Sequence, residues 1–266
     1  MPLAVCATPI GNLGDVTLRV LEELAAAEVV LCEDTRRTRR LLDRHGVEAR
    51  LLSYHRHNEA ARTAEILPRL EEGARVALVS DAGLPGVNDP GARLIAAAVE
   101  AGVPVTVLPG PSAVETALVV SGLGAERYQF LGYLPRGEAA RATLWEELRR
   151  WPHAAVAFES PKRLPQTLAG LAEAMPERRV AVCRELTKRF EEVVRGTAEE
   201  VAATFPEPPR GEITLVVGPA EVAGDVGEAA SAVAELVSAG VGRRGAVDLV
   251  SRLTGVPRNS LYRRSL

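Results

Sequence analysis

The chain has 266 residues, of which 47% are hydrophobic and 25% are charged, and its formal net charge is −3. This length allows two domains, each with its own core, and the composition is that of an ordinary globular protein. No apolar run approaches the roughly 18 residues of a membrane-spanning helix, and residues 1–8 lack the basic segment of a signal peptide, so we expect a cytoplasmic protein.

The three cysteines are widely spaced, and each lies in an apolar run: Cys6, Cys32 and Cys183. This pattern is typical of buried core thiols. We therefore expect neither a disulfide nor a metal site.

Three predicted strands in the first half each run into a turn rich in Gly and Pro. The strands cover residues 3–7, 75–79 and 103–108, and their turns begin at Thr8, Ser80 and Pro109. If the strands are parallel within one sheet, all three turns lie at its carboxyl edge, where open α/β sheets bind ligands. The turns offer close backbone approach at three glycines and carboxylates at two positions: Gly11, Gly83, Gly110, Asp15 and Asp81.

Helix signals follow these strands. Asp15 or Thr17 can cap a first helix, and Asp34 can cap a second over residues 35–44. A third helix is predicted over residues 58–70. The Asp89-Pro90 pair predicts a fourth helix that continues to Ala101, and the spacing of Ser112 and Glu115 predicts a capping box at the start of a fifth.

The second half combines strands and helices in a pattern that includes hairpins, so we expect a mixed sheet. The predicted strands cover residues 130–134, 154–159, 179–184, 191–194 and 213–217, and the helices cover residues 139–150, 163–174 and 198–202. After residue 226, short helices resemble a helix-turn-helix. Residues 240–266 of this appendage carry six arginines and one aspartate, a balance of 6 − 1 = +5.

Seven motifs together resemble the ribosomal small subunit methyltransferase I family of the tetrapyrrole-methylase superfamily. They are TPIGNLGD (8–15), CEDTR (32–36), SYHRHNE (53–59), VSDAG (79–83), PGPSA (109–113), ESPKR (159–163) and RELTK (184–188). The resemblance implies an α/β fold of two domains with S-adenosylmethionine in the cleft between them, and a homodimer. It also implies methylation of a ribose 2′-hydroxyl on a cytidine in the decoding centre of 16S rRNA.

On this basis we expect an N-terminal α/β domain over residues 1–120, a mixed α/β domain over residues 125–219 and a basic helical appendage over residues 226–266. The resemblance, together with the glycine and aspartate positions above, assigns cofactor binding to Pro9, Gly11, Ser80, Asp81, Ala82, Gly83, Ser112, Ala113, Phe158, Ile213 and Thr214. Residues 84–88 read LPGVN where relatives often carry a different proline-containing sequence, which affects the shape of that loop.

Because a ribose hydroxyl is a poor nucleophile, a nearby base would assist methyl transfer. The candidates for this catalytic role are His55, His57, Glu33, Asp34 and Glu59. The alternatives are a solvent-facing histidine pair that contacts phosphate, and helix capping by the two acids next to Arg36. The sequence identifies no single base.

Two arginine groups indicate RNA contact. The residues assigned to this surface are Arg36, Arg37, Arg39, Arg40, Lys162, Arg163, Arg243, Arg244, Arg258 and Arg263. A solvated helix face is the alternative for the first group, and packing on the core or on a second copy is the alternative for the appendage. Tyr54 and Tyr262 are the expected base-stacking platforms.

Two other functions compete with rRNA methylation. A tetrapyrrole C-methyltransferase of the same superfamily would act on an anionic macrocycle, for which an extended basic surface is unnecessary. A non-catalytic RNA-binding ribosome-assembly factor would retain the fold without binding cofactor.

Overall fold

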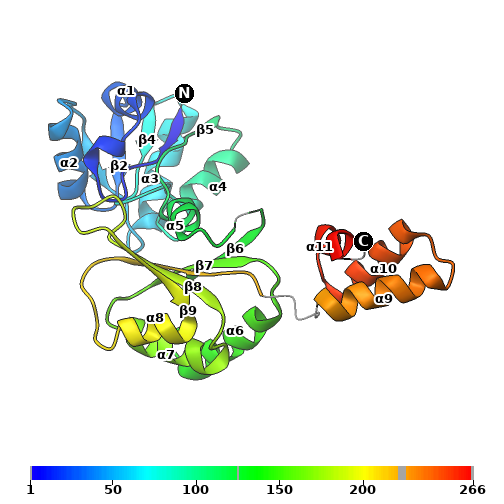
Figure 1. The fold of residues 1–266 in the computed structure, drawn as a ribbon. Helices are drawn as coiled ribbons and strands as arrows, with labels where there is room; N and C mark the ends of the chain where they lie inside the picture. Colours follow the sequence, from blue (N-terminus) through cyan, green and yellow to red (C-terminus); the bar gives the residue numbers. More distant parts are fainter. Residues whose placement is uncertain (1, 125, 221–225, 265–266) are drawn as a thin grey trace.

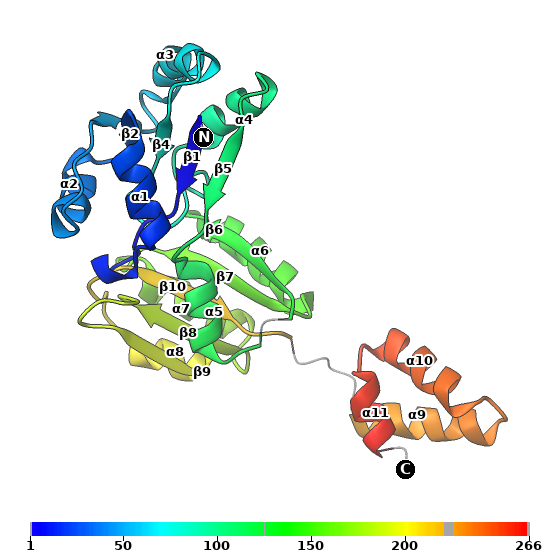
Figure 2. The same ribbon diagram turned by 90° about the horizontal axis from the view of Figure 1, so that it is seen from above.

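The computed structural model describes residues 2–124, 126–220 and 226–264, except for the side chains of residues 226, 263 and 264. Two five-stranded sheets with their helices form the main body, and three C-terminal helices stand apart from it (Figures 1 and 2). The predicted α/β architecture with a helical appendage is confirmed.

The first sheet is entirely parallel and has the strand order β3-β2-β4-β1-β5. Its strands are β1 (Leu3–Cys6), β2 (Val29–Cys32), β3 (Leu51–Ser53), β4 (Val76–Leu78) and β5 (Val105–Leu108). Because β1 pairs with both β4 and β5, the three Gly/Pro-rich turns lie at one carboxyl edge, as predicted.

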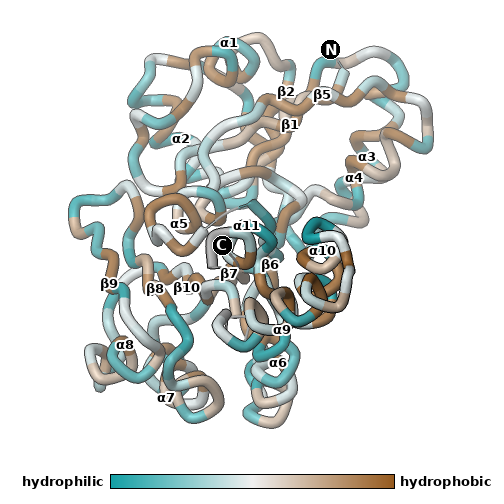
Figure 3. The backbone as a smooth tube through the Cα atoms, turned by 45° about the vertical axis from the view of Figure 1, so that its right-hand side comes forward, coloured by the Kyte–Doolittle hydropathy of each residue, from teal (hydrophilic) through white to brown (hydrophobic). Residues whose placement is uncertain are grey.

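Both faces of this sheet are covered, which explains why its central strands are continuous apolar runs. Leu3 and Val5 pack with residues of α3 (Glu59–Glu71) and α4 (Ala92–Glu100), whereas Ala4 and Cys6 pack with residues of α1 (Leu18–Ala26) and α2 (Thr35–Arg44). Alternate residues of a strand point to opposite faces, so β1 contributes to two cores. Figure 3 shows the hydrophobic course of β1, β2 and β5.

All three cysteines are buried and free, as predicted. Burial raises the pKa of the Cys6 and Cys183 thiols to about 12. These thiols are therefore protonated at neutral pH and act as small apolar side chains.

Two predicted helix starts are confirmed. The Thr17 hydroxyl accepts the Val20 N–H at the start of α1, and the Asp34 carboxylate accepts the Arg36 N–H at the start of α2. Asp15 lies instead in a short 3-10 helix, η1 (Leu13–Asp15).

The predicted start of the fourth helix at Asp89-Pro90 is wrong. Helix α4 begins at Ala92, because Gly91 has a φ of 138° and donates its N–H to Glu59 Oε1 at 3.0 Å. A side chain at this glycine would lie 3.0 Å from Leu78 Cδ2, so the loop is tightly packed here. Asp89 is consequently a loop residue and not a helix cap.

The predicted capping box at Ser112 is also wrong. Ser112 is the N-cap of α5 (Ala113–Ser121) but makes no side-chain cap, because its hydroxyl donates directly to the Glu115 carboxylate. The other oxygen of Glu115 accepts the Tyr128 hydroxyl at 2.7 Å. The glutamate therefore connects the helix to the second sheet.

The second sheet is mixed, as predicted, in the order β6-β7-β10-β8-β9. Its strands are β6 (Tyr128–Tyr133), β7 (Ala154–Glu159), β8 (Arg179–Arg184), β9 (Glu192–Thr197) and β10 (Ile213–Val217). Only the β6–β7 pair is parallel, and its register shifts between Phe130 and Tyr133.

Helix α5 joins the two sheets because it follows β5 but packs on the second sheet. Its Val114, Ala117 and Leu118 share a core with Val156 of β7 and Val216 of β10. The opposite face of the second sheet is covered by α6 (Glu138–Arg150), α7 (Leu164–Ala174) and α8 (Ala198–Thr204).

A second connection forms between the first turn and the loop after β8. The Asn12 N–H donates to Thr187 Oγ1 at 3.1 Å. A Cβ at Gly11 would lie 2.5 Å from Lys188 Cγ and 2.8 Å from the Leu186 carbonyl oxygen. Gly11 therefore permits close packing of these two loops.

The appendage consists of α9 (Val226–Ser238), α10 (Arg243–Thr254) and α11 (Arg258–Arg264). These helices enclose a small core of their own, made by Ala229, Val233, Ala246, Val247, Val250, Val256 and Leu261. Among the helices that the structure describes, none has both the length and the apolar character needed to cross a membrane.

Candidate active site

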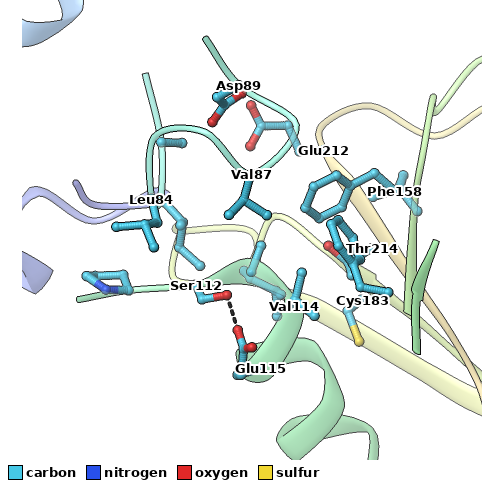
Figure 4. Close-up of a pocket in the computed structure, with 18 of the residues that line it drawn as sticks. Leu84, Val87, Asp89, Ser112, Val114, Glu115, Phe158, Cys183, Glu212 and Thr214 are labelled. Carbon is cyan, nitrogen blue, oxygen red and sulfur yellow. Dashed lines mark hydrogen bonds between the residues drawn. The ribbon is translucent and has the colours of Figure 1, made fainter. Parts of the chain in front are cut away.

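A cavity of about 740 Å³ lies where the carboxyl edge of the first sheet meets the second sheet. The first half contributes the turns after β4 and β5, and the second half contributes residues of β6, β7, β8 and β10. Figure 4 shows Leu84, Val87 and Asp89 across from Phe158 and Thr214, with Ser112 and Val114 between them.

The cavity brings together eight of the eleven residues assigned to cofactor binding. These lining residues are Asp81, Ala82, Gly83, Ser112, Ala113, Phe158, Ile213 and Thr214. They come from the loops after β4 and β5, from the first residue of α5 and from the strands β7 and β10, so folding brings together residues that are far apart in the sequence.

The other three, Pro9, Gly11 and Ser80, are not among the lining residues, but Ser80 is bonded to the turns that form the wall. The Thr8 hydroxyl donates to the Ser80 carbonyl at 3.0 Å, and the Ser80 hydroxyl reaches the Ala82 carbonyl at 3.1 Å. Thr8 and Gly83 exchange two backbone hydrogen bonds, of 2.8 and 3.0 Å. Gly83 has a φ of 75°, a conformation that glycine adopts readily.

Asp81 connects the second turn to α2. Its Oδ1 accepts the Asp34 N–H at 3.0 Å, and its Oδ2 lies 3.4 Å from the Arg37 guanidinium. Arg37 also lines the cavity. The first arginine group therefore begins at the cavity wall.

None of the four main catalytic candidates, Glu33, Asp34, His55 and His57, is among the described residues that line the cavity. Asp34 caps α2 and forms a two-point contact with the Arg36 guanidinium, at 2.8 and 3.1 Å, which matches the capping alternative. Burial and the charges of Asp81 and Asp89 raise the pKa of Glu33.

The two histidines lie in the loop between β3 and α3, with ring centroids 5.9 Å apart. The His55 Nδ1 atom is buried without a hydrogen-bond partner in the described chain. Glu59, the fifth candidate, accepts the Tyr54 hydroxyl at 3.2 Å and the Gly91 N–H at 3.0 Å. Its carboxylate therefore holds the loop that precedes α4.

The structure adds acidic residues that the sequence pattern did not single out. Asp89 and Glu212 both line the cavity and lie on the side opposite Ser112 and Glu115 (Figure 4). Burial and the charge of Asp81 raise the pKa of Asp89. In the sequence, the Asp89-Pro90 pair has the pattern of a helix start, so the pattern gives no separate indication of a site residue here.

Aromatic residues form one wall of the cavity. Phe158 makes edge contacts with Phe130 and Tyr133, with ring centroids 5.1 and 5.5 Å apart. Tyr133 is 64% exposed, whereas Tyr54 is 1% exposed. Tyr54 is bonded to Glu59 and Thr63, so the prediction that it stacks on a base is wrong.

Helix α2 presents most of the first arginine group to solvent. Arg36, Arg39 and Arg40 are exposed, and Arg39 also donates to the Ala49 carbonyl at 3.4 Å. The group thus forms a basic surface that begins next to the cavity at Arg37.

The remaining assigned cations have different surroundings. Lys162 is exposed, but Arg163 pairs with the buried Glu159 and donates to the Leu134 carbonyl at 3.1 Å. Arg163 is therefore a structural residue of the second sheet. In the appendage, Arg244 is exposed and Arg258 pairs with Asp248.

Arg243 is half-buried at the start of α10. The side chain of Arg263 lies outside the described residues. Within the described chain, no three His, Cys, Asp or Glu side chains are grouped so as to hold a metal ion.

Comparison with known proteins identifies the family. A model of the tetrapyrrole (corrin/porphyrin) methylases matches residues 2–202. A protein of Mesorhizobium japonicum named ribosomal RNA small subunit methyltransferase I is 43% identical over 99% of this chain and 91% of its own length. The chain belongs to this methyltransferase family. A relative of the same name from Micromonospora olivasterospora is 46% identical over 96% of this chain and 83% of its own length.

A more distant structural relative has the same fold as the main body. The uroporphyrin-III C-methyltransferase of Thermus thermophilus, solved in complex with S-adenosylhomocysteine, superimposes with a TM-score of 0.57 at 19% identity. The match covers 81% of this chain and 96% of that structure.

Proposed function

We propose that the protein is an S-adenosylmethionine-dependent methyltransferase of small-subunit ribosomal RNA. The observation that carries this proposal is the 43% identity, over nearly the whole chain, with a relative of that name. We further propose that the acceptor is the ribose 2′-hydroxyl of a cytidine in the decoding centre of 16S rRNA, as the motif resemblance implies.

The cavity fits a cofactor of this kind. Its volume of about 740 Å³ lies within the ~300–1,000 Å³ of typical small-molecule sites. Buried apolar side chains of Ile10, Val114 and Leu186 line it, and Ser112 and Thr214 add hydroxyl groups. An adenosine ring and a sulfonium methyl group need such an apolar wall, with a few polar groups to fix orientation.

Residues 81–83, Ser112, Ala113 and Phe158, together with Ile213 and Thr214, would hold the cofactor. When bound, it supplies an activated methyl group that an oxygen nucleophile displaces in line. The chain must therefore position the RNA, keep water out and accept a proton. Positioning alone can contribute ~7–11 kcal/mol to such a reaction.

The basic surface of α2 supports RNA as the substrate. Its arginines start at the cavity wall with Arg37 and continue outward, so phosphates held there would lie beside the cavity entrance. The appendage, which follows residues 221–225 in the sequence, supplies a second basic surface. A small macrocyclic substrate would make no use of either surface.

We also propose that the active form is a homodimer and that its partner is 16S rRNA within the small subunit. Exposed apolar side chains on helices of the first half support self-association: Val99 is 63% exposed and Val119 is 77% exposed. Light scattering should then give twice the chain mass of 28.3 kDa.

One assay tests the proposed function. The protein is incubated with methyl-labelled cofactor and, separately, with naked 16S rRNA, small subunits and a tetrapyrrole. Label in rRNA or in subunits is the expected result. Label in the tetrapyrrole alone would favour the corrin/porphyrin activity, and cofactor binding without transfer to any acceptor would contradict a methyltransferase role.

A further inference from the structure

Five carboxylates line the cavity among the described residues: Asp81, Asp89, Glu115, Glu159 and Glu212. A group that accepts a proton from a substrate hydroxyl needs an oxygen that other donors do not already occupy. The hydrogen bonds of the five residues separate them on this criterion.

Two of the five are held within the second half. Glu159 is 2% exposed and accepts the Thr167 hydroxyl at 2.6 Å and the Ser160 N–H at 2.5 Å, besides its pair with Arg163. Glu212 pairs with Lys188 at 2.9 Å, and its side chain is 68% exposed. Glu159 therefore has a structural role, and the charge of the exposed Glu212 carboxylate is balanced by Lys188.

Two more are held in or beside the first half. Glu115 accepts the hydroxyls of Ser112 and Tyr128, and although burial opposes them, these bonds hold its pKa below the usual value. Asp81 accepts the Asp34 N–H and faces Arg37. The oxygens of both carboxylates are therefore already engaged by donors within the protein.

Asp89 differs from the other four. It is half-buried in the loop between β4 and α4, and its polar neighbours are the Ser80 hydroxyl, which also reaches two backbone carbonyl oxygens, and the charged groups of Asp81 and Arg56. Burial and the charge of Asp81 keep its pKa above the ordinary aspartate value of about 3.9. Asp89 thus combines access to the cavity with increased basicity.

The surroundings of Asp89 suit a nucleoside. Val87 of the same loop is 48% exposed, and Tyr133 is exposed and close enough for Asp89 to contribute to its raised pKa, after burial and the charge of Glu212. The β6 strand comes close to this loop where its register shifts between Phe130 and Tyr133, because a Cβ added at Gly132 would lie 3.1 Å from the Asn88 side chain. A base stacked on Tyr133 would place its ribose near Asp89.

We propose that Asp89 is the catalytic base that accepts the proton of the substrate hydroxyl. This assignment rests on the proposed function. The hydroxyl oxygen forms the new bond to the methyl carbon while the carbon–sulfur bond breaks. The electron pair of the broken bond stays on sulfur. The hydroxyl proton passes to the Asp89 carboxylate.

Glu33 is the alternative base on the first half because its pKa is also raised. It lies outside the cavity lining, however, and faces the charges of Asp81, Asp89, Arg56 and Arg37. The variants Asp89→Asn and Glu33→Gln distinguish these two candidate bases.

The first test is the pH dependence of kcat with saturating cofactor and RNA. The groups that face Asp89 are Asp81, Glu33, Arg56 and Tyr133. A base must be deprotonated to act, so the wild-type rate should fall as pH drops through the raised pKa of Asp89. Asp89→Asn should lower kcat about a hundredfold or more and remove this acid limb. Glu100→Gln, an exposed carboxylate at the end of α4, is the charge-matched control and should match wild type.

The second test measures binding without turnover. RNA with a single 2′-deoxycytidine at the target should bind the wild-type protein about tenfold more weakly than the all-ribose RNA, because a hydrogen bond to a charged group is lost. In Asp89→Ala the two RNAs should bind equally. Calorimetric cofactor affinity and melting temperature should stay near wild type in both Asp89 variants.

Two kinetic results would overturn the assignment: a near-normal kcat in Asp89→Asn, or an acid limb that disappears in Glu33→Gln instead. Two binding results would also overturn it: an unchanged preference for the ribose RNA in Asp89→Ala, or a large loss of cofactor affinity in either Asp89 variant. Methyl transfer by the wild-type protein tests the proposed function separately. If wild-type protein transfers methyl to ribose but Asp89→Asn does so equally well, only the role of Asp89 is wrong. If wild-type protein leaves ribose unlabelled, the proposed function is wrong, and the role of Asp89 falls with it.

Discussion

Asp81 links the second turn, the start of α2 and the cavity wall through two contacts. We expect Asp81→Ala to weaken cofactor binding about tenfold, because a charged hydrogen-bond acceptor is lost from the cavity. Calorimetric titration measures this effect, and Asp43→Ala, an exposed aspartate on α2, is the control. An unchanged cofactor affinity in a folded Asp81→Ala protein would remove Asp81 from the site.

Tyr133 is an exposed aromatic residue close enough to Asp89 to feel its charge, and it lies in the proposed nucleoside position. Stacking on one base contributes ~1–3 kcal/mol, so Tyr133→Ala should raise KM for RNA about tenfold, with a smaller effect on KM for cofactor. Tyr133→Phe keeps the ring and should stay close to wild type. Equal losses in both variants would indicate that the hydroxyl group, not stacking, is important.

At the scale of elements, α2 supplies the basic surface beside the cavity. Arg37 is unsuitable as a probe of RNA binding because it also contacts Asp81. Replacing Arg36 and Arg40 by alanine should weaken RNA binding and make its salt dependence shallower by about 1 to 2 in the slope of log K against log salt. The double variant of Arg149 and Arg150, exposed on α6, removes the same charge and should leave the slope unchanged.

The sequence predicted the elements that depend on local pattern. The apolar strands at residues 3–6, 76–78 and 105–108 and the caps at Thr17 and Asp34 follow from burial and from side-chain hydrogen bonds to nearby amides. Their common edge then places five of the assigned cofactor residues in the wall of one cavity: Asp81, Ala82, Gly83, Ser112 and Ala113.

The errors have a common physical origin in contacts between distant segments. Asp89 leaves its predicted capping position because Gly91 bonds to Glu59, 32 residues away. Ser112 loses its capping box because Glu115 accepts its hydroxyl directly and also binds Tyr128. Tyr133 lines the cavity at the end of β6, after the shift in strand register that begins at Phe130. No local pattern encodes the contact of Gly91 with Glu59, the contact of Glu115 with Tyr128 or the register shift of β6.

At the scale of the whole molecule, the appendage has its own core and stands apart from the main body (Figures 1 and 2). A chain that ends near Pro219 should therefore stay folded and bind cofactor with normal affinity. It should methylate small subunits more slowly at subsaturating substrate, because the arginines of α10 and α11 no longer add to RNA affinity. A full rate would exclude a docking role, and loss of folding or of the dimer would make the appendage structural.

The position of the transferred methyl group tests the central claim most directly. Alkali cleaves RNA through the free 2′-hydroxyl, so a 2′-O-methylated nucleotide remains joined to its 3′ neighbour after hydrolysis. Small subunits labelled by the wild-type protein should yield the label in a single alkali-stable dinucleotide that begins with cytidine. Label released entirely in mononucleotides would place the methyl group on a base and would contradict the account.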